Sequence, residues 1–421
     1  MSSYNHKSIA LISVHGDPAV EIGAEEAGGQ NVYVRHLGEA LARQGWQVEM
    51  FTRQAHADRP AVVEHCPGCR TIRLTAGPTD FIHRDEIFGF LPEFIEQFQQ
   101  FQQQNGIRYP IVHTNYWLSG WVGLQLQKQG LKHVHVHHSL GAVKYRATAS
   151  MPPIASKRLE TEQTCVETAD WMVATSPQEQ EHMKSLVSNK GNLCVIPCGT
   201  DIQRFGSVGR TEARQRLGIA PETKMVFYIG RFDPRKGIET LVRAVGLSQF
   251  RHDERLQLIV GGGSRPDRND GRERDRIGKL VTELGLDDVT IFPGRISDED
   301  LPAYYAAADV CVVPSHYEPF GLVAIEAMAS STPVVASKVG GLQYSVVSEE
   351  TGLLVPAKND EAFANAIDRI LADPDWRDRL GQAARARSVK RFSWDGVASQ
   401  MSDLYESLLE SSSRVLDPIG A

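Results

Sequence analysis

The sequence has few cysteines, no long apolar runs and no large excess of charge of either sign. Its six cysteines, among 421 residues, are mostly scattered, which is unlike a secreted disulfide framework, so we expect reduced thiols. Residues 1–8 lack the apolar stretch of a signal peptide, and we find no uncharged apolar run long enough to span a bilayer. We therefore expect a cytoplasmic protein with no membrane partner.

The charge balance argues against nucleic acid as a partner. A net charge of -7 and a pI near 6.1 create no overall field that attracts a polyanion. With 41% hydrophobic residues the chain can bury full-sized cores, and its length exceeds what one core usually serves. We expect a globular protein of two domains.

Short apolar runs alternate with amphipathic or glycine-containing stretches, a pattern typical of parallel α/β layers. In the first half the predicted strands are 9–14, 48–51, 111–113, 134–138, 172–175 and 193–196. In the second half they are 225–229, 256–260, 289–292, 310–314, 334–336 and 353–355. The predicted fold class is α/β.

The domain boundary is predicted in the glycine-containing segment 198–217, which has little apolar content. We place the first domain at 1–205 and the second at 206–393. Helices are expected at 360–370 and 376–389, and the amphipathic segment 394–410 is a candidate to pack back on the first domain.

Three loops that follow predicted strands carry residues suited to ligand binding, because ligands of parallel sheets collect at the carboxyl ends of strands. The first contains Gly28–Gln30 before a helical pattern, which suits close approach to an anionic or hydroxyl-rich group. The second runs from Gly230 to Gly237 and places Arg231 and Lys236 where they can clamp a diphosphate. An ordinary tight turn and a solvated basic turn are the alternatives.

The third loop, 314–323, carries Glu318 and leads to Glu326 in the following helix. Two carboxylates there can accept hydrogen bonds from separate sets of sugar hydroxyls. Glu326 lies among apolar residues, where an unpaired charge is expensive.

The histidine-rich strand 134–138 offers a further polar group. Alternation places His135 and His137 on one face and His138 on the other, so the cluster does not require a metal. We expect His135 and His137 to be structural and His138 to be functional. Cys66 and Cys69 flank Pro-Gly, which favours a turn between strands over a zinc or redox site.

Taken together, these motifs resemble those of the retaining glycosyltransferases of GT-B family 4, over nearly the whole chain. The motifs that carry the resemblance are Gly28–Gln30, His138–Gly141, Gly230–Arg231 with Lys236–Gly237, and Glu318–Gly321 followed by Glu326. Within the family the chain most resembles the short bacterial sucrose-phosphate synthases. The resemblance implies two Rossmann-like domains facing across a cleft.

The resemblance also implies roles for individual residues in donor binding and catalysis. It assigns Arg231 and Lys236 to the diphosphate, Glu318 to the transferred glucose and Glu326 to the ribose. The other implied donor contacts are Gly29, Arg295, Ile296, Phe320, Gly321, Leu322 and Val323. The implied catalytic residues are His138, Arg231, Lys236 and Glu318.

The implied partners are UDP-glucose and fructose 6-phosphate, the latter held by the first domain. The implied acceptor residues are Gly28, Gly29, Gln30, Arg84, His138, Lys144, Lys157 and Arg158. Arg84 stands in a loop where the family often has lysine, a departure that affects the acceptor assignment. No metal site is expected, and Mg²⁺ is at most a stimulator, because the two cations can stabilise the departing diphosphate.

Other activities share these features. Sucrose synthase uses free fructose, and an inositol-phosphate N-acetylglucosaminyltransferase shares the double glycine followed by Asn31-Val32-Tyr33. A nucleotide-sugar epimerase would act without an acceptor, and a non-catalytic nucleotide-sugar sensor would bind the donor without turnover. The basic residues near the histidine strand favour a phosphorylated acceptor.

Overall fold

The structure is a computed structural model, and it describes residues 7–20, 28–147, 151–265 and 268–413. The chain divides into two compact units. Unit 1 comprises residues 1–197 with 394–421, and unit 2 comprises residues 198–393. In the described ranges, no helix combines the length and the apolar content needed to cross a membrane.

Unit 1 is built on a mostly parallel sheet whose described strands number eight, in the order β3-β4-β2-β1-β5-β6-β7-β8. The strands are β1 (Ser8–Ile12), β2 (Gln47–Arg53), β3 (Val62–Cys66), β4 (Cys69–Leu74), β5 (Ile111–Asn115), β6 (Lys132–Val136), β7 (Trp171–Ala174) and β8 (Leu193–Val195). Only β3 pairs antiparallel among the described strands. The order reverses between β1 and β5, which places a ligand-binding edge there.

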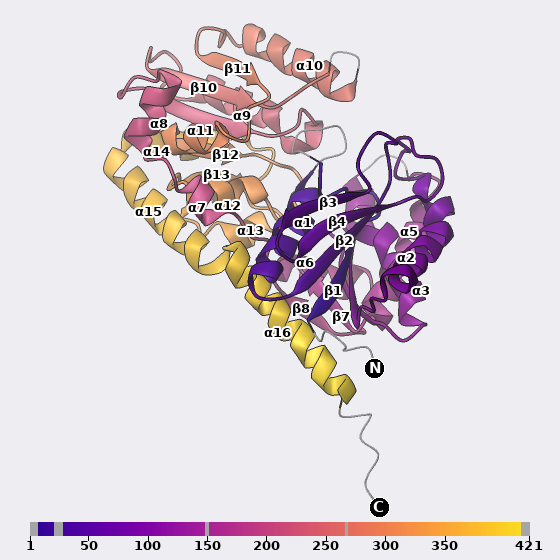
Figure 1. Cartoon of the computed structure of the whole chain (residues 1–421). Coiled ribbons are helices and arrows are strands. Elements are labelled where there is room, and N and C mark those ends of the chain that lie inside the picture. Colours follow the sequence, from indigo (N-terminus) through magenta and orange to yellow (C-terminus); the bar gives the residue numbers. More distant parts are fainter. Residues whose placement is uncertain (1–6, 21–27, 148–150, 266–267, 414–421) are drawn as a thin grey trace, which may run out of the picture. The chain divides into compact units, whose positions relative to one another are not determined.

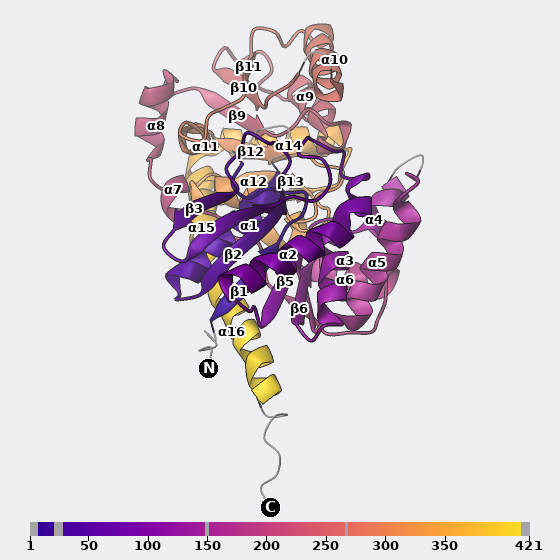
Figure 2. The ribbon, with the colours of Figure 1, turned by 45° about the vertical axis from the view of Figure 1, so that its right-hand side comes forward.

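Helices cover both faces of this sheet (Figure 1). They are α1 (Gly29–Arg43), η1 (Ile87–Phe90), α2 (Leu91–Asn105), α3 (Tyr116–Gln127), α4 (Gly141–Lys144), η2 (Tyr145–Ala147), α5 (Ala155–Thr168), α6 (Pro177–Leu186) and α16 (Trp394–Ser413). Figures 1 and 2 both place α2, α3 and α5 together, and side chains of α2 and α3 share a core with Phe51 of β2. On the other face α1 packs at Gly38 against Val48 and Met50.

Helix α16 completes the α1 side of unit 1. Trp46 donates a hydrogen bond from Nε1 to Ser402 Oγ at 2.9 Å, and its ring meets Tyr405 edge-on. Tyr405 also lies 2.5 Å, through its hydroxyl, from His113 Nδ1 in β5. A segment far along the chain therefore supplies core residues to the first sheet.

Unit 2 has a parallel sheet with the order β11-β10-β9-β12-β13-β14 among its described strands. The strands are β9 (Lys224–Ile229), β10 (Leu256–Gly261), β11 (Thr290–Gly294), β12 (Val310–Val313), β13 (Val334–Ser337) and β14 (Gly352–Val355). The helices are α7 (Ile202–Phe205), α8 (Arg210–Leu217), η3 (Pro234–Lys236), α9 (Ile238–Leu247), α10 (Asn269–Glu283), α11 (Leu301–Ala307), α12 (Leu322–Ala329), α13 (Leu342–Ser345), α14 (Asp360–Ala372) and α15 (Pro374–Arg391). This is the strand order of a dinucleotide-binding Rossmann fold.

The predicted α/β class is confirmed, and all twelve predicted strands are present, with ends that differ by up to two residues. Two strands, β3 and β4, were not predicted. They form a hairpin in which Cys66 pairs with Cys69 and Gly68 has φ +82°. The Pro-Gly turn between strands is therefore confirmed.

Buried histidines in and directly after β6 form a hydrogen-bonded cluster with Thr114 of β5. Thr114 Oγ1 lies 2.7 Å from both His133 Nε2 and His135 Nδ1, so its hydroxyl donates to one ring and accepts from the other. His135 Nε2 lies 3.1 Å from His137 Nδ1. Helix α3 approaches these rings through Gly123, where a side-chain carbon would overlap His133. His135 and His137 are fully buried within this packing, as expected of structural residues.

Burial makes this cluster sensitive to acid. It lowers the pKa of His113 and His137 to about 3 and that of His133 to about 4, from 6.5. These residues therefore stabilise the fold fully above about pH 6.5, and the contribution falls as the pH drops and the unfolded chain takes up protons. At pH 5.5, one unit below the unfolded pKa of 6.5, each such histidine lowers the free energy of unfolding by about 1.4 kcal/mol.

We predict that His133→Gln reduces the loss of unfolding free energy between pH 7.5 and pH 5.5 by about 1.4 kcal/mol. Urea titrations followed by tryptophan fluorescence will measure this, since five of the six tryptophans lie outside 198–393 and report on unit 1. His83→Asn, at an exposed position, is the control and should leave the pH dependence unchanged. Equal pH dependence in wild type and His133→Gln would contradict the assignment.

Candidate active site

The predicted diphosphate and sugar ligands lie in unit 2, at the edge where its strand order reverses. Strands β9 and β12 are neighbours, so the loops 230–237 and 314–321 leave the sheet side by side. His316 donates its backbone N–H to the carbonyl of Arg235 at 2.8 Å. Gly237 has φ +69°, and a side-chain carbon there would overlap the carbonyl oxygen of Pro314. The two loops are thus fixed to each other by backbone contacts.

Two of the predicted donor residues form an ion pair. Lys236 Nζ lies 2.5 Å from Glu318 Oε2, and Ser315 Oγ lies 3.4 Å from the same oxygen. The Glu318 backbone is held by Gly341, whose N–H donates to the Glu318 carbonyl at 3.1 Å. Arg231, the second predicted diphosphate ligand, is exposed after β9. The structure therefore brings Lys236 and Glu318 together.

Glu326, the predicted ribose ligand, is held from behind by a buried tyrosine. Tyr305 in α11 donates its hydroxyl proton to Glu326 Oε2 at 2.7 Å. Burial, with the Glu326 carboxylate as a second cause, raises the pKa of Tyr305 well above its usual value, so the hydroxyl remains a donor. Glu326 itself is half-buried on α12.

The other predicted donor residues lie along the same edge. Phe320 is buried, Gly321 caps α12 with φ +91°, and Leu322 and Val323 form the half-buried first turn of that helix. Arg295 is exposed and Ile296 is half-buried, directly after β11.

The sequence reasoning missed a glycine triplet, Gly261–Gly263, at the end of β10. A side-chain carbon at Gly261 would overlap Ile296, and one at Gly262 would overlap the carbonyl of Gly230. The triplet therefore lies between the loop of Arg231 and the segment of Arg295. The sequence did contain a signal for this feature, because three consecutive glycines follow a predicted strand.

In unit 1 the predicted acceptor residues Gly28–Gln30 begin helix α1. Gly28 and Gly29 are exposed. Gln30 donates from Nε2 to Ser13 Oγ at 2.9 Å and to the Asn115 carbonyl at 3.3 Å. Gln30 therefore joins the ends of β1 and β5, the strands between which the order reverses.

His138 lies just beyond the end of β6 in a left-handed conformation, φ +55°. Its Nε2 donates to Asn115 Oδ1 at 2.8 Å. The Asn115 amide is oriented by Nδ2, which donates to the Ile12 carbonyl, so its oxygen faces His138 and acts as the acceptor. Burial lowers the pKa of His138 to about 3, so the ring is neutral and Nδ1 is an acceptor. His138 can therefore accept a hydrogen bond from a hydroxyl.

The four predicted basic residues of unit 1 differ in exposure. The side chain of Arg84 is 45% exposed and that of Lys157 is 39% exposed, while Lys144 is half-buried. Arg158 is only 2% exposed, because its guanidinium contacts Glu162, the Tyr116 hydroxyl and the Ser139 carbonyl. Arg84, Lys144 and Lys157 can reach solvent, whereas Arg158 is built into the wall beside the His138 loop.

Two further residues beside this loop were not in the predicted site. Glu162 binds Arg158 Nε at 2.7 Å and accepts the backbone N–H of Gly141 at 2.8 Å, so it anchors the loop. The spacing of Arg158 and Glu162, four residues apart on a helix, was the signal. His15 follows β1 and packs against Tyr116 at 4.5 Å, and Arg84, His138 and Arg158 are near enough to help burial lower its pKa to about 3.

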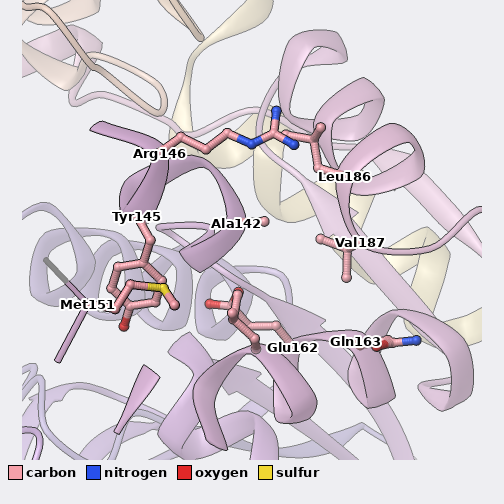
Figure 3. Close-up of a pocket in the computed structure, with 9 residues that line it drawn as sticks. Ala142, Tyr145, Arg146, Met151, Glu162, Gln163, Leu186 and Val187 are labelled. Atoms are coloured by element: carbon pink, nitrogen blue, oxygen red, sulfur yellow. The ribbon is translucent and has the colours of Figure 1, made fainter. Parts of the chain in front are cut away.

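A pocket of about 380 Å³ adjoins the same region of unit 1 (Figure 3). Its lining consists of Ala142, Tyr145, Arg146, Met151, Leu159, Glu162, Gln163, Leu186 and Val187. Figure 3 shows the Glu162 carboxylate pointing into the pocket toward Ala142, with Arg146 extended across the opposite side near Leu186. Among the described residues, no group of three or more His, Cys, Asp or Glu side chains is arranged to hold a metal ion.

Comparison with protein families finds two matching domain models. Residues 28–199 match the glycosyl transferase 4-like domain, and residues 209–387 match the glycosyl transferases group 1 domain. All but the last two residues of the first match lie in unit 1, and the second match covers most of unit 2.

Individual relatives match over nearly the whole chain. The chain is 37% identical to a D-inositol 3-phosphate glycosyltransferase of Corynebacterium efficiens, covering 94% of each chain. It is 36% identical to the enzyme of the same name from Kineococcus radiotolerans, covering 97% of this chain and 98% of that one.

Solved structures agree with this placement. A sucrose-phosphate synthase from Thermosynechococcus elongatus is 52% identical with a TM-score of 0.87, covering 96% of this chain and 100% of that one. Anabaena HepE, 19% identical with a TM-score of 0.74 over 96% of this chain and 100% of its own, has the same fold. The chain therefore belongs to the family 4 glycosyltransferases, with two parallel-sheet α/β domains of the GT-B type.

Proposed function

We propose that this glycosyltransferase is a sucrose-phosphate synthase. It transfers glucose from UDP-glucose to fructose 6-phosphate with retention, and it releases sucrose 6-phosphate and UDP. The observation that carries the proposal is the 52% identity to the sucrose-phosphate synthase of Thermosynechococcus elongatus along 96% of the chain. The site residues of both units are compatible with this pair of substrates.

A second candidate is transfer to an inositol phosphate, supported by the 36–37% identity to D-inositol 3-phosphate glycosyltransferases. Both acceptors carry a phosphate and several hydroxyls, so the basic residues of unit 1 suit either. The higher identity to the sucrose-phosphate synthase favours fructose 6-phosphate.

In the proposed reaction, unit 2 binds the donor. Lys236 and Arg231 contact the diphosphate and stabilise the negative charge that develops on it as the glycosidic bond breaks. Glu318 accepts hydrogen bonds from the glucose hydroxyls, and Glu326, oriented by Tyr305, accepts those of the ribose. Arg295 and Ile296 flank the base, and backbone groups of Phe320–Val323 close round the sugar and phosphates.

Unit 1 binds the acceptor in this proposal. Gly28–Gln30 lie against its hydroxyls, and neutral His138 accepts a hydrogen bond from a sugar hydroxyl. Arg84, Lys144 and Lys157 supply positive charge for the phosphate, and Arg158 is the innermost cation of the group.

Retention follows from attack on the same face as the leaving diphosphate. The glycosidic carbon passes through an oxocarbenium-like state, and the departing phosphate oxygen takes the proton of the attacking hydroxyl. This route needs no enzyme nucleophile, unlike a retaining glycosidase. Arg231 and Lys236 are then the groups on which the rate depends most strongly.

The function is tested by nucleoside diphosphate release from UDP-glucose with fructose 6-phosphate, fructose, inositol 1-phosphate or no acceptor. We expect turnover with fructose 6-phosphate and a product of sucrose phosphate mass that retains the α configuration of glucose by NMR. Turnover with fructose alone would indicate a sucrose synthase, and turnover with inositol phosphate would support the second candidate. UDP release without acceptor would indicate a hydrolase, and conversion of UDP-glucose to an altered nucleotide sugar without UDP release would indicate an epimerase. Donor binding without turnover would indicate a sensor.

The acceptor assignment predicts a selective effect of Arg84→Ala and of Lys157→Ala. Each should raise KM for fructose 6-phosphate roughly 10- to 100-fold, because a charge-assisted contact to phosphate is lost. KM for UDP-glucose should stay within about twofold. Lys128→Ala, an exposed lysine at the end of α3, is the control and should change neither constant. An equal rise of both KM values would refute the assignment.

The donor assignment predicts that Arg231→Ala and Lys236→Ala each lower kcat roughly 100- to 1000-fold, the usual loss when one stabilising group of a developing anion is removed. Steady-state kinetics at saturating substrate will measure this, and EDTA should leave the wild-type enzyme active. Arg243→Ala, on the exposed side of α9, serves as the control. A normal kcat in both variants, or full inhibition by EDTA, would count against these two cations.

A further inference from the structure

We infer that the Lys236–Glu318 ion pair makes the donor site prefer a nucleoside diphosphate that carries a sugar over one that does not. The inference rests on the proposed function, because it takes Lys236 as a diphosphate ligand and Glu318 as a sugar ligand. It adds that the side chains of Lys236 and Glu318 bind each other when the site holds no donor. The observed pair, at 2.5 Å, is the starting point.

The backbone of the two loops holds Lys236 and Glu318 close to each other. Next to Lys236, Gly237 lies against the Pro314 carbonyl so closely that no side chain fits between them. Glu318 is held by the turn at Gly340 and Gly341, since a side-chain carbon at Gly340 would overlap the Glu318 carbonyl. Both charged side chains therefore extend from fixed loops that face each other.

The surroundings leave few other partners for these two charges. The Glu318 side chain is only 14% exposed, and Ser315 Oγ, 3.4 Å away, is its second polar contact. Arg235, another cation of the same loop, is held by Asp233 at 2.5 Å. Glu318 thus depends largely on Lys236, and a carboxylate that loses its partner while shielded from water is destabilised.

A bare nucleoside diphosphate draws Lys236 away from Glu318 and leaves the carboxylate beside new negative charge. A nucleotide sugar has the same effect on Lys236, but its hydroxyls donate hydrogen bonds to Glu318 and replace the lost partner. The two halves of the donor therefore bind cooperatively, through a group that each of them affects. After transfer the sugar is gone, so the pair re-forms and favours release of the diphosphate.

The test compares binding of UDP and of UDP-glucose to wild type and Glu318→Gln by isothermal titration calorimetry. In Glu318→Gln the lysine is freed and the nearby negative charge is removed, so UDP should bind more tightly, by roughly 3- to 10-fold, as for loss of a partly exposed ion pair. UDP-glucose should bind more weakly, because an amide is a poorer acceptor than a carboxylate. The preference for UDP-glucose over UDP should fall more than threefold.

Glu326→Gln is the matched control, because it changes the second carboxylate to an amide in the same region of unit 2. Glu326→Gln should weaken the binding of UDP and of UDP-glucose by similar factors, since both carry the ribose. The ratio of the two affinities should stay unchanged. Glu318→Ala serves as a second variant if Glu318→Gln does not fold, as judged by circular dichroism. It should also bind UDP more tightly than wild type does.

The outcomes separate the inference from the proposed function. If wild type binds both nucleotides and the Glu318 variants bind UDP no more tightly than wild type, the inference is wrong and the donor assignment stands. If wild type binds neither UDP nor UDP-glucose, both fail. A ratio that falls equally in Glu326→Gln would also overturn the inference, because the effect would not be specific to the ion pair.

Discussion

The proposed donor site of unit 2 depends on the absence of side chains at two glycines. Gly237 lies against the carbonyl of Pro314, and Gly340 lies against that of Glu318; at either place a single additional carbon would force the loops apart. Because both glycines have positive φ, +69° and +45°, the backbone there is also in the region that other residues rarely adopt. These contacts bring the loops after β9 and β12 close enough for Lys236 and Glu318 to meet.

In the proposed acceptor site of unit 1, strained backbone is supported by buried polar contacts. Tyr116 and His138 both have positive φ, +73° and +55°, at the ends of β5 and β6, and such conformations cost about 1–3 kcal/mol each. Asn115 binds the His138 ring, and Arg158 binds the Tyr116 hydroxyl. Glu162 in turn fixes Arg158 and the first amide of α4. The site is therefore held by a network that begins in helix α5 and ends at His138.

The sequence predicted the fold well because buried parallel strands are continuous apolar runs, and all twelve such runs were found. Strand β3 was missed because it lies at the sheet edge, where two of its five residues, Val62 and Glu64, are solvent-exposed. Strand β4 was missed because Arg70, Thr71 and Arg73 interrupt its apolar residues. The motifs after the strands predicted which residues gather at the edge of the sheet in unit 2. They could not predict that Lys236 and Glu318 pair, since that distance depends on Gly340, more than twenty residues further along the chain.

The same reasoning explains why the acceptor is harder to identify than the donor. The side chains of Arg84, Lys144 and Lys157 are cations, and fructose 6-phosphate and an inositol phosphate are both anions, so these residues do not separate the two proposed acceptors. Discrimination requires groups that read the hydroxyls of the ring, and such groups are few and directional: Gln30 and the acceptor nitrogen of His138 are examples. Their orientation is set by Ser13 and Asn115, which belong to the ends of β1 and β5. Under the proposed function, acceptor choice therefore depends on where those strands end more than on the basic residues that the sequence displays.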